Sequence, residues 1–326
     1  MKKKMINATR IEGVLYQHKL ELKVSGANSK KPGTEYISGT VDIATDNKMT
    51  NIVQVHYTYV TATTSSGKEN STFKTLKGII DGTIGCYTDP AVKDNAAKVR
   101  IDSTIGLNEF YSNRNGDEEL VSVKRNEGGF IHVTPSISEN EAQRSTFEVD
   151  IVILKAFEKD EVTDASGNVV APQRVILDGR IFDFRNNMLP VQFSVISEQA
   201  QKYFLDLNPS PKEPVFTKIK GNIISQQITR YITEASAFGE DSVREVQSSN
   251  KDYIVTWAAQ DPYEFGLEET ITIDDLRACG QARENALAEM KQRADEWRAQ
   301  QGNAIKAATP AAAAPAVAST DDQYDF

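Results

Sequence analysis

The sequence predicts a mainly β protein with one or two small barrels, a short helix, a C-terminal helix and a disordered acidic tail. Three observations lead to this prediction. Three consecutive runs near the N-terminus alternate apolar with polar residues, which is the period of a half-buried strand. A later stretch spaces its apolar residues as a helix does. Residues 303–326 combine an Ala/Pro tract with an acidic cluster.

The three alternating runs lie within residues 13–63 and are expected to form an antiparallel meander. Polar loops rich in Gly, Asn and Ser separate them. Gly13 and Gly39 lie inside the runs, and either is suited to the bulge that lets a strand bend around a barrel. The inner face is predicted to comprise Val14, Tyr16, Leu20, Leu22, Val24, Ile37, Gly39, Val41, Ile43, Val53, Val55, Tyr57 and Tyr59.

This meander resembles the opening of an OB-fold, a five-stranded barrel that binds single-stranded nucleic acids on its second and third strands and adjacent loops. The resemblance implies that the outer face of the meander binds DNA. Planar side chains there are expected to stack on bases, while lysines meet the phosphates. The predicted binding residues are Lys19, Lys23, Tyr36 and His56, with Lys30 and Lys31 in the first loop.

Further strands are predicted at residues 98–105, 120–124, 130–133 and 146–156. A charged connector, residues 158–172, is expected to separate a first OB-like β domain, residues 1–157, from a second β module with a C-terminal helix, residues 173–302. Aliphatic–acidic–glycine steps at residues 11–13 and 177–179 suggest two related modules. The second module is expected to extend the DNA path through Arg180, Arg185, Lys218 and Lys220.

Two stretches predict helices. Residues 195–207 place several apolar side chains on one face, and three prolines follow. Residues 273–301 form the only long helical pattern, with Thr272 or Asp274 as its cap. The apolar stripe along this helix is expected to dock on the parent domain, with self-association as the alternative.

Composition and charge limit the function classes. The chain has 326 residues and a net charge of −9. This charge argues against a protein that coats nucleic acid through an overall positive charge alone. Eight cations against two acids in residues 2–31 are nevertheless compatible with a local binding groove. Cys86 and Cys279 are expected to be reduced thiols. The sequence contains no run of 18 apolar residues, which a membrane span would require. We expect a cytoplasmic protein.

The tail resembles that of bacterial and phage single-stranded DNA-binding proteins, in which a folded domain is followed by a low-complexity linker and an acidic tip ending in an aromatic residue. Bacterial members have Pro before the final Phe, where this chain has Asp325, whereas phage members have looser tips that fit better. The resemblance implies recruitment of replication or recombination enzymes, with the terminal ring entering an apolar pocket. The predicted partner-binding residues are Asp321, Asp322, Tyr324, Asp325 and Phe326.

Catalytic patterns are not found in the sequence. It has no Gly-x-x-x-x-Gly-Lys phosphate loop, and its three histidines lack metal-ligand spacing with the cysteines. Glu21-Leu22-Lys23 imitates the end of a nuclease motif, but Glu12 is the only carboxylate upstream to hold a metal. We therefore expect no enzyme, cofactor or metal. Two alternatives to single-strand binding stay open: a β-rich virion or structural protein, and a strand-annealing recombinase.

Overall fold

The computed structural model describes residues 5–27, 29–112, 118–163, 169–234, 242–267 and 270–307, of which residues 170, 226–234, 242–250 and 300–307 are described by their backbone alone. The predicted partner-binding residues, from Asp321 to Phe326, lie outside this part of the chain, and so does most of the predicted linker.

The first half of the chain forms a closed ring of five strands. The strands pair in the order β1-β2-β3-β5-β4, and β4 returns to pair with β1. Among the strand pairs described in this ring, the β3–β5 pair is parallel, and a helix, α1, lies between β3 and β4 in the chain. This is the OB-fold arrangement that the meander predicted. The elements are β1 (Asn7–Val24), β2 (Glu35–Ala44), β3 (Ile52–Thr61), α1 (Ser71–Ile80), β4 (Lys98–Ser112) and β5 (Glu119–Val133).

The second half repeats this order. Its strands pair as β6-β9-β10-β12-β11, with β11 returning to β6, a parallel β10–β12 pair and helix α2 after the third strand. A small hairpin, β7–β8, is inserted after β6. The elements are β6 (Ser145–Lys159), β7 (Val162–Thr163), β8 (Val169–Ala171), β9 (Arg174–Phe182), β10 (Met188–Val195), α2 (Glu198–Asp206), β11 (Val215–Glu234) and β12 (Ser242–Ala258).

Strand β6 closes the second ring, although the sequence placed residues 146–156 in the first domain. By strand pairing the two barrels divide between β5 and β6, not at residues 158–172, which hold the β7–β8 hairpin. The alternation along a strand shows that one face is buried, but it does not show which ring the strand closes.

The barrels are joined through their first strands, β1 and β6, which pair antiparallel from Asn7↔Val149 to Ile11↔Ser145. The joint is nearly symmetric. The amide of Glu12 donates to the carbonyl of Arg144 at 2.6 Å, and the amide of Asp150 donates to the carbonyl of Ile6 at 2.8 Å. The step along the chain from the donor Glu12 to the donor Asp150 equals the step from the acceptor Ile6 to the acceptor Arg144. The two hydrogen bonds are therefore equivalent, and an approximate two-fold axis relates the barrels. The counterpart of β1 is therefore β6, and residues 177–179 belong to a second strand, β9.

The predicted inner face of β1 is wrong before Tyr16. The register with β2 shifts between Leu15 and Gln17, so a bulge at Tyr16 exchanges the two faces of the strand. Leu15, predicted to face outward, is fully buried. Leu20 follows the bulge and is buried as predicted, whereas Leu22 and Val24 near the strand end are exposed.

The inner faces of β2 and β3 are confirmed for Ile37, Val41, Ile43, Val53, Val55 and Tyr57, which are all buried. A second bulge falls between Ile37 and Gly39, as predicted for Gly39. This glycine has φ +132°, and a β-carbon there would lie 2.0 Å from the carbonyl oxygen of Lys19. Gly13 marks a close approach of β1 to Ala44 in place of a bulge.

Helix α1 was not predicted. Phe73, Leu76 and Ile79 recur at helical spacing and are buried, and the side chain of Asn70 caps the helix by accepting from the Thr72 amide. Helix α2 is confirmed. No helix within the described residues is long and apolar enough to cross a membrane.

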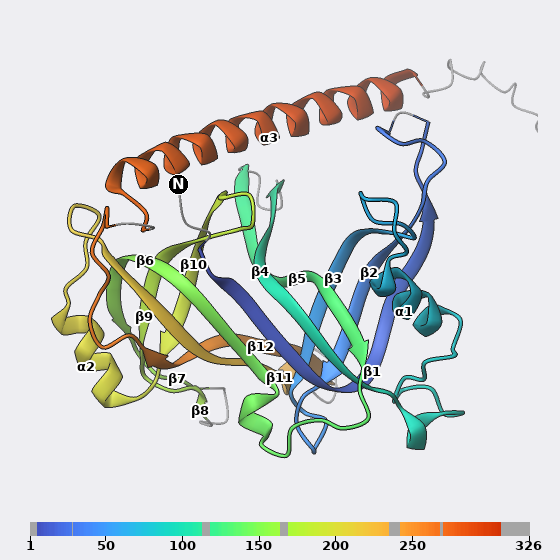
Figure 1. Ribbon diagram of the computed structural model, residues 1–326, viewed down its shortest axis with the longest axis horizontal. Coiled ribbons are helices and arrows are strands. Elements are labelled where there is room, and N and C mark those ends of the chain that lie inside the picture. Colours follow the sequence, from blue (N-terminus) through green and yellow to red (C-terminus); the bar gives the residue numbers. More distant parts are fainter. Residues whose placement is uncertain are drawn as a thin grey trace, which may run out of the picture.

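The long helix α3 (Ile273–Ala307) continues past its predicted end at Gln301, into the tract predicted to be disordered from Asn303. Figure 1 shows it running along one side of the molecule, from the second barrel past the ends of β4 and β5. Its first turns pack on the second barrel, where Leu276 and Cys279 contact a small cluster around Phe182. Farther along, Arg283 pairs with Glu109 of β4 at 2.5 Å. The predicted docking of this helix on its own chain is confirmed.

Candidate nucleic-acid interface

The outer surface of β1, β2 and β3 brings together the residues predicted from the meander. The strand registers place Lys19 opposite Thr40 and Thr40 opposite His56, so these three form one transverse row. Lys23 lies opposite Tyr36 in a second row. We call Lys19, Lys23, Tyr36, His56 and Tyr59 the tyrosine–lysine face.

Tyr59 was predicted to be a core residue, but 49% of its surface is exposed. Its ring lies 4.5 Å from the ring of Tyr36, centroid to centroid, and its hydroxyl is 3.1 Å from Ser25 Oγ. The hydrogen bond and the ring contact hold both tyrosines in place. Tyr36 is half-buried, and the exposed ring of Tyr59 beside it offers a surface on which bases can stack.

Two further cations that were not predicted from the sequence lie near this face. Arg125 of β5 and Lys251 of β12 act on His56: burial lowers the pKa of this half-buried imidazole, and the charges of Arg125 and Lys251 lower it further. The imidazole is therefore neutral at pH 7 and presents a planar ring. Lys251 belongs to the second barrel, so both barrels contribute to this region.

The acids near the face are largely engaged. Asp42 is buried, and its carboxylate accepts from Gln17 Nε2 at 2.7 Å and from Gln54 Nε2 at 2.8 Å. Glu21 pairs with Lys23 at 2.9 Å. Within the described residues, Lys19, Lys30 and Lys31 form no ion pair, so their charges are available to a ligand.

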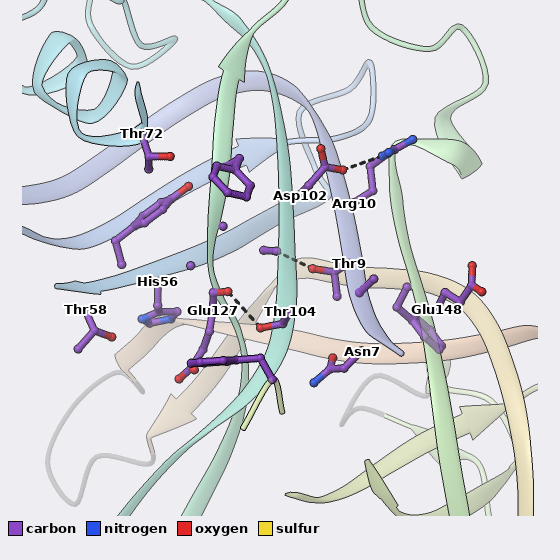
Figure 2. A pocket seen from close by; sticks show the side chains of 18 of the residues that line it. Asn7, Thr9, Arg10, His56, Thr58, Thr72, Asp102, Thr104, Glu127 and Glu148 are labelled. Atoms are coloured by element: carbon purple, nitrogen blue, oxygen red, sulfur yellow. Dashed lines mark hydrogen bonds and ion pairs between the residues drawn. The ribbon is translucent and has the colours of Figure 1, made fainter. Parts of the chain in front are cut away.

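An open groove of about 1340 Å³ adjoins this face and crosses from the first barrel to the second. Figure 2 shows His56 and Thr58 on one side of it and Glu148 on the other, with the Arg10–Asp102 ion pair between them. Exposed rings line the groove at Tyr59, Phe130 and Phe184. Its charged lining is mixed and comprises Arg10, Arg185, Lys220, Asp102, Glu127 and Glu148.

The residues predicted in the second barrel divide into two groups. Arg185 and Lys220 line the groove. Arg180 does not line it and pairs with Asp178 at 3.0 Å. Lys218 and Lys220 both pair with Glu148, at 3.3 and 3.1 Å. Burial raises the pKa of Glu148, but the hydrogen bonds from the two lysines outweigh this effect and lower it overall.

The exposed rings of Phe184, Phe130 and Trp257 were not predicted as binding residues. Phe184, expected in the core, is 69% exposed in the turn after β9, whereas its neighbour Phe182 is buried as expected. Phe130 is 64% exposed and Trp257 is 48% exposed. The last two lie beside register shifts in β5 and β12, where the alternation of a strand no longer predicts which side chains face outward. Within the described residues, no group of three His, Cys, Asp or Glu side chains is placed to hold a metal ion.

Comparison with known proteins gives one family and a distant structural likeness. The family model described as YorF matches residues 6–293. No curated protein matches the chain. A solved structure similar to this one is a deletion mutant of the single-stranded DNA binding protein from Thermus aquaticus, with a TM-score of 0.42 and 8% identity over 81% of this chain and 98% of that chain.

Proposed function

The chain belongs to the YorF family, and we propose that it binds single-stranded DNA without strong sequence preference. The observation that carries this proposal is the partly exposed Tyr36–Tyr59 ring pair, which lies among lysines on the outer face of the first barrel.

The chemistry of the tyrosine–lysine face fits an unpaired strand. Each base stacked on an aromatic ring contributes about 1–3 kcal/mol, and every base has a face to stack. The lysines pair with phosphates and release counterions, which favours binding at low salt. A duplex hides its base faces, so it gains the contribution of counterion release but not that of stacking. The acidic total charge of the protein does not oppose this, because the cations gather locally. Such binding requires no catalytic group.

The first test compares fluorescence anisotropy of labelled oligo(dT) and of a duplex of equal length, at two salt concentrations. We expect much tighter binding of the single strand. Tyr36→Ala with Tyr59→Ala is expected to weaken it at least 10-fold, because two stacking surfaces are lost. Trp297→Ala is the matched control, since this exposed ring lies on α3, away from the face. Equal affinity for duplex and single strand, or no loss in the tyrosine variant, would contradict the proposal.

The second test measures the salt dependence of binding. Lys30→Ala with Lys31→Ala is expected to reduce the slope of log K against log salt by about 1–2, because each phosphate contact contributes nearly one unit. The control replaces two exposed lysines of the second barrel, Lys202→Ala with Lys212→Ala, and should keep the slope. If the Lys30→Ala, Lys31→Ala variant has the same salt slope as the control variant and the native protein, the phosphate contacts lie elsewhere.

A role in DNA replication or recombination, with recruitment of partner enzymes through residues 321–326, is the finer part of the proposal and is supported by the sequence alone. Deleting these residues should leave DNA affinity equal or higher, because carboxylates repel phosphates. Phe326→Ala keeps all of the charge and should abolish co-purification of replication enzymes. Unchanged co-purification would contradict recruitment without affecting DNA binding.

A further inference from the structure

Phe130 and Trp257 occupy corresponding positions in the two barrels. Phe130 lies opposite Asp102 in the β4–β5 pair, and Trp257 lies opposite Lys220 in the β11–β12 pair. Asp102 and Lys220 correspond because each precedes the residue that meets the symmetric joint: Ser103 pairs with Thr9, and Gly221 pairs with Phe147. Thr9 and Phe147 pair with each other at the centre of the joint.

Between the two rings lies the outer surface of β4, β1, β6 and β11, which we call the saddle. In the first barrel Asp102 forms ion pairs with Arg10 at 2.9 Å and with Arg100 at 3.5 Å. In the second barrel Glu148 forms ion pairs with Lys218 and Lys220. Each half of the saddle thus has one carboxylate between two cations.

The saddle carries almost no net charge. In the two-fold relation Arg10 corresponds to Glu148, so the carboxylate lies on β4 in one half and on β6 in the other. Two more acids complete the balance: Glu12 accepts the Ser138 amide, and Asp150 accepts the Ile6 amide at 2.7 Å. Binding at this surface would therefore depend on stacking much more than on counterion release.

Among the described side chains of the second barrel, a cation lies beside each of the exposed rings of Trp257 and Phe184. Lys220 Nζ lies 5.3 Å from the centre of the Trp257 ring, and the guanidinium of Arg185 lies 5.0 Å from the centre of the Phe184 ring. Arg185, Phe184 and Lys220 all line the groove. A cation next to an open ring suits a nucleotide, because the base stacks on the ring while the phosphate meets the cation.

Phe130 and Trp257 are far apart along the sheet. Five interstrand steps separate β5 from β12 across the saddle, or about 24 Å along the curved surface at 4.7–4.9 Å per step. A mononucleotide cannot contact both rings, but one strand of many nucleotides can.

We propose that the saddle is a second, stacking-dominated subsite for the same single strand, with bases on Phe130 and on Trp257, and Phe184 beside them. The inference rests on the proposed function. It assigns the second barrel to DNA binding and predicts that short oligonucleotides occupy the tyrosine–lysine face alone, whereas long ones also cover the saddle.

The test uses the fluorescence of Trp257. The protein has two tryptophans, so Trp297→Phe leaves Trp257 as the single reporter. Titration with (dT)25 is expected to quench its emission, because a stacked base contacts the indole, and (dT)5 is expected to leave it unchanged at saturation. Phe130→Ala and Trp257→Ala should each weaken (dT)25 binding about 5- to 100-fold by anisotropy. The salt slope and the (dT)5 affinity should not change. Phe110→Ala, an exposed ring outside the groove lining, is the control.

The outcomes separate this inference from the proposed function. Tight (dT)25 binding with no quenching and no effect of the two variants overturns the saddle subsite and leaves DNA binding by the first barrel intact. Absence of any binding overturns both. If Trp257 emission instead depends on protein concentration, and Phe130→Ala changes the sedimentation coefficient, the saddle is an interface between two copies and the inference is overturned.

Discussion

The two barrels share a topology and two equivalent bulges, yet one corresponding row of side chains differs completely between them. In the first barrel the row after the β1 bulge is Lys19, Thr40 and His56. In the second barrel the register shifts between Ile153 and Lys155, and the corresponding row is Phe157, Ile176 and Ser194. The shared backbone sets where these side chains lie, and the side chains decide which surface is polar.

The difference extends to the residues around each row. Ile176 is 6% exposed, and Ser194 Oγ is 2.8 Å from Asp252 Oδ1, so the second row is part of the packed structure. Lys19 is exposed and His56 is half-buried. One barrel thus uses this row for stability, while the other leaves it available for a ligand.

The fifth strands show a second contrast. Lys124 of β5 donates to the carbonyl of Gln192 at 2.5 Å and lies 3.9 Å from the centre of the Tyr253 ring, so its ammonium is enclosed by the second barrel. Burial lowers the pKa of Lys124 to about 7, and the charge of Asp252 opposes this only in part. Lys251, at the corresponding place on β12, is exposed.

The largest effect is expected from making the second row resemble the first. Ile176→Thr should lower the free energy of unfolding by about 2–3 kcal/mol, because it removes buried methylene groups and places a hydroxyl in apolar surroundings. Urea denaturation followed by circular dichroism measures this. Single-strand affinity should stay the same in the folded variant. A loss below about 1 kcal/mol would show that the row is not packed as described.

A smaller effect concerns pH. The pKa of Lys124 is about 7 in the folded protein and near 10.5 when unfolded, so between these values the unfolded chain binds more protons. The free energy of unfolding should therefore rise with pH, by about 1–2 kcal/mol from pH 7 to 8.5, and Lys124→Met should remove this rise. Urea denaturation at each pH gives both values.

The matched control for this measurement is Lys251→Met, which alters the corresponding exposed lysine and should keep the full rise. Burial lowers the pKa of His18 and of His56, so both are neutral throughout the window. Burial raises the pKa of Cys86 to about 11. The native protein and both lysine variants share this effect, so it cancels when their free energies of unfolding are compared. An equal rise in Lys124→Met and the native protein would contradict an enclosed ammonium.

The smallest effect is expected from making the first row resemble the second. Within the described residues, the buried hydroxyl of Thr40 has no hydrogen-bond partner. Thr40→Val keeps the shape and removes this polar atom, so it should raise the free energy of unfolding by up to about 1 kcal/mol. Thermal denaturation detects this as a small increase in Tm. A decrease would indicate that the hydroxyl is satisfied in solution.

Much of the fold could be predicted from periodicity, because alternation along β2 and β3 directly reflects one buried face. Alternation does not indicate the buried face where the backbone departs from regular pairing. The bulge at Tyr16 exchanged the faces of β1, and the shifts beside Phe130 and Trp257 concealed two exposed rings. The closure of β6 into the second ring also depends on contacts distant in sequence.

The candidate site was predictable only where it lies within one meander. Lys19, Lys23, Tyr36 and His56 share a surface because neighbouring strands in the chain are neighbours in the sheet. Lys251 approaches His56 from a strand almost 200 residues away, and no local pattern gives such a contact. Tyr59 lies at the register shift between β2 and β3, so the alternation read from the sequence assigned it to the wrong face.

The antiparallel joint between β1 and β6 has a consequence for any ligand that has a direction. A two-fold axis presents the same surface twice in opposite orientations, whereas a nucleic-acid strand runs from 5′ to 3′ and cannot reverse at the joint. A strand that crosses it would therefore meet the second barrel backwards. Identical contacts in both barrels would serve one polarity in one barrel and the opposite polarity in the other. Divergent side chains on a shared backbone, such as Asp102 against Lys220 and Phe130 against Trp257, would let both halves accept a single polarity of the proposed strand.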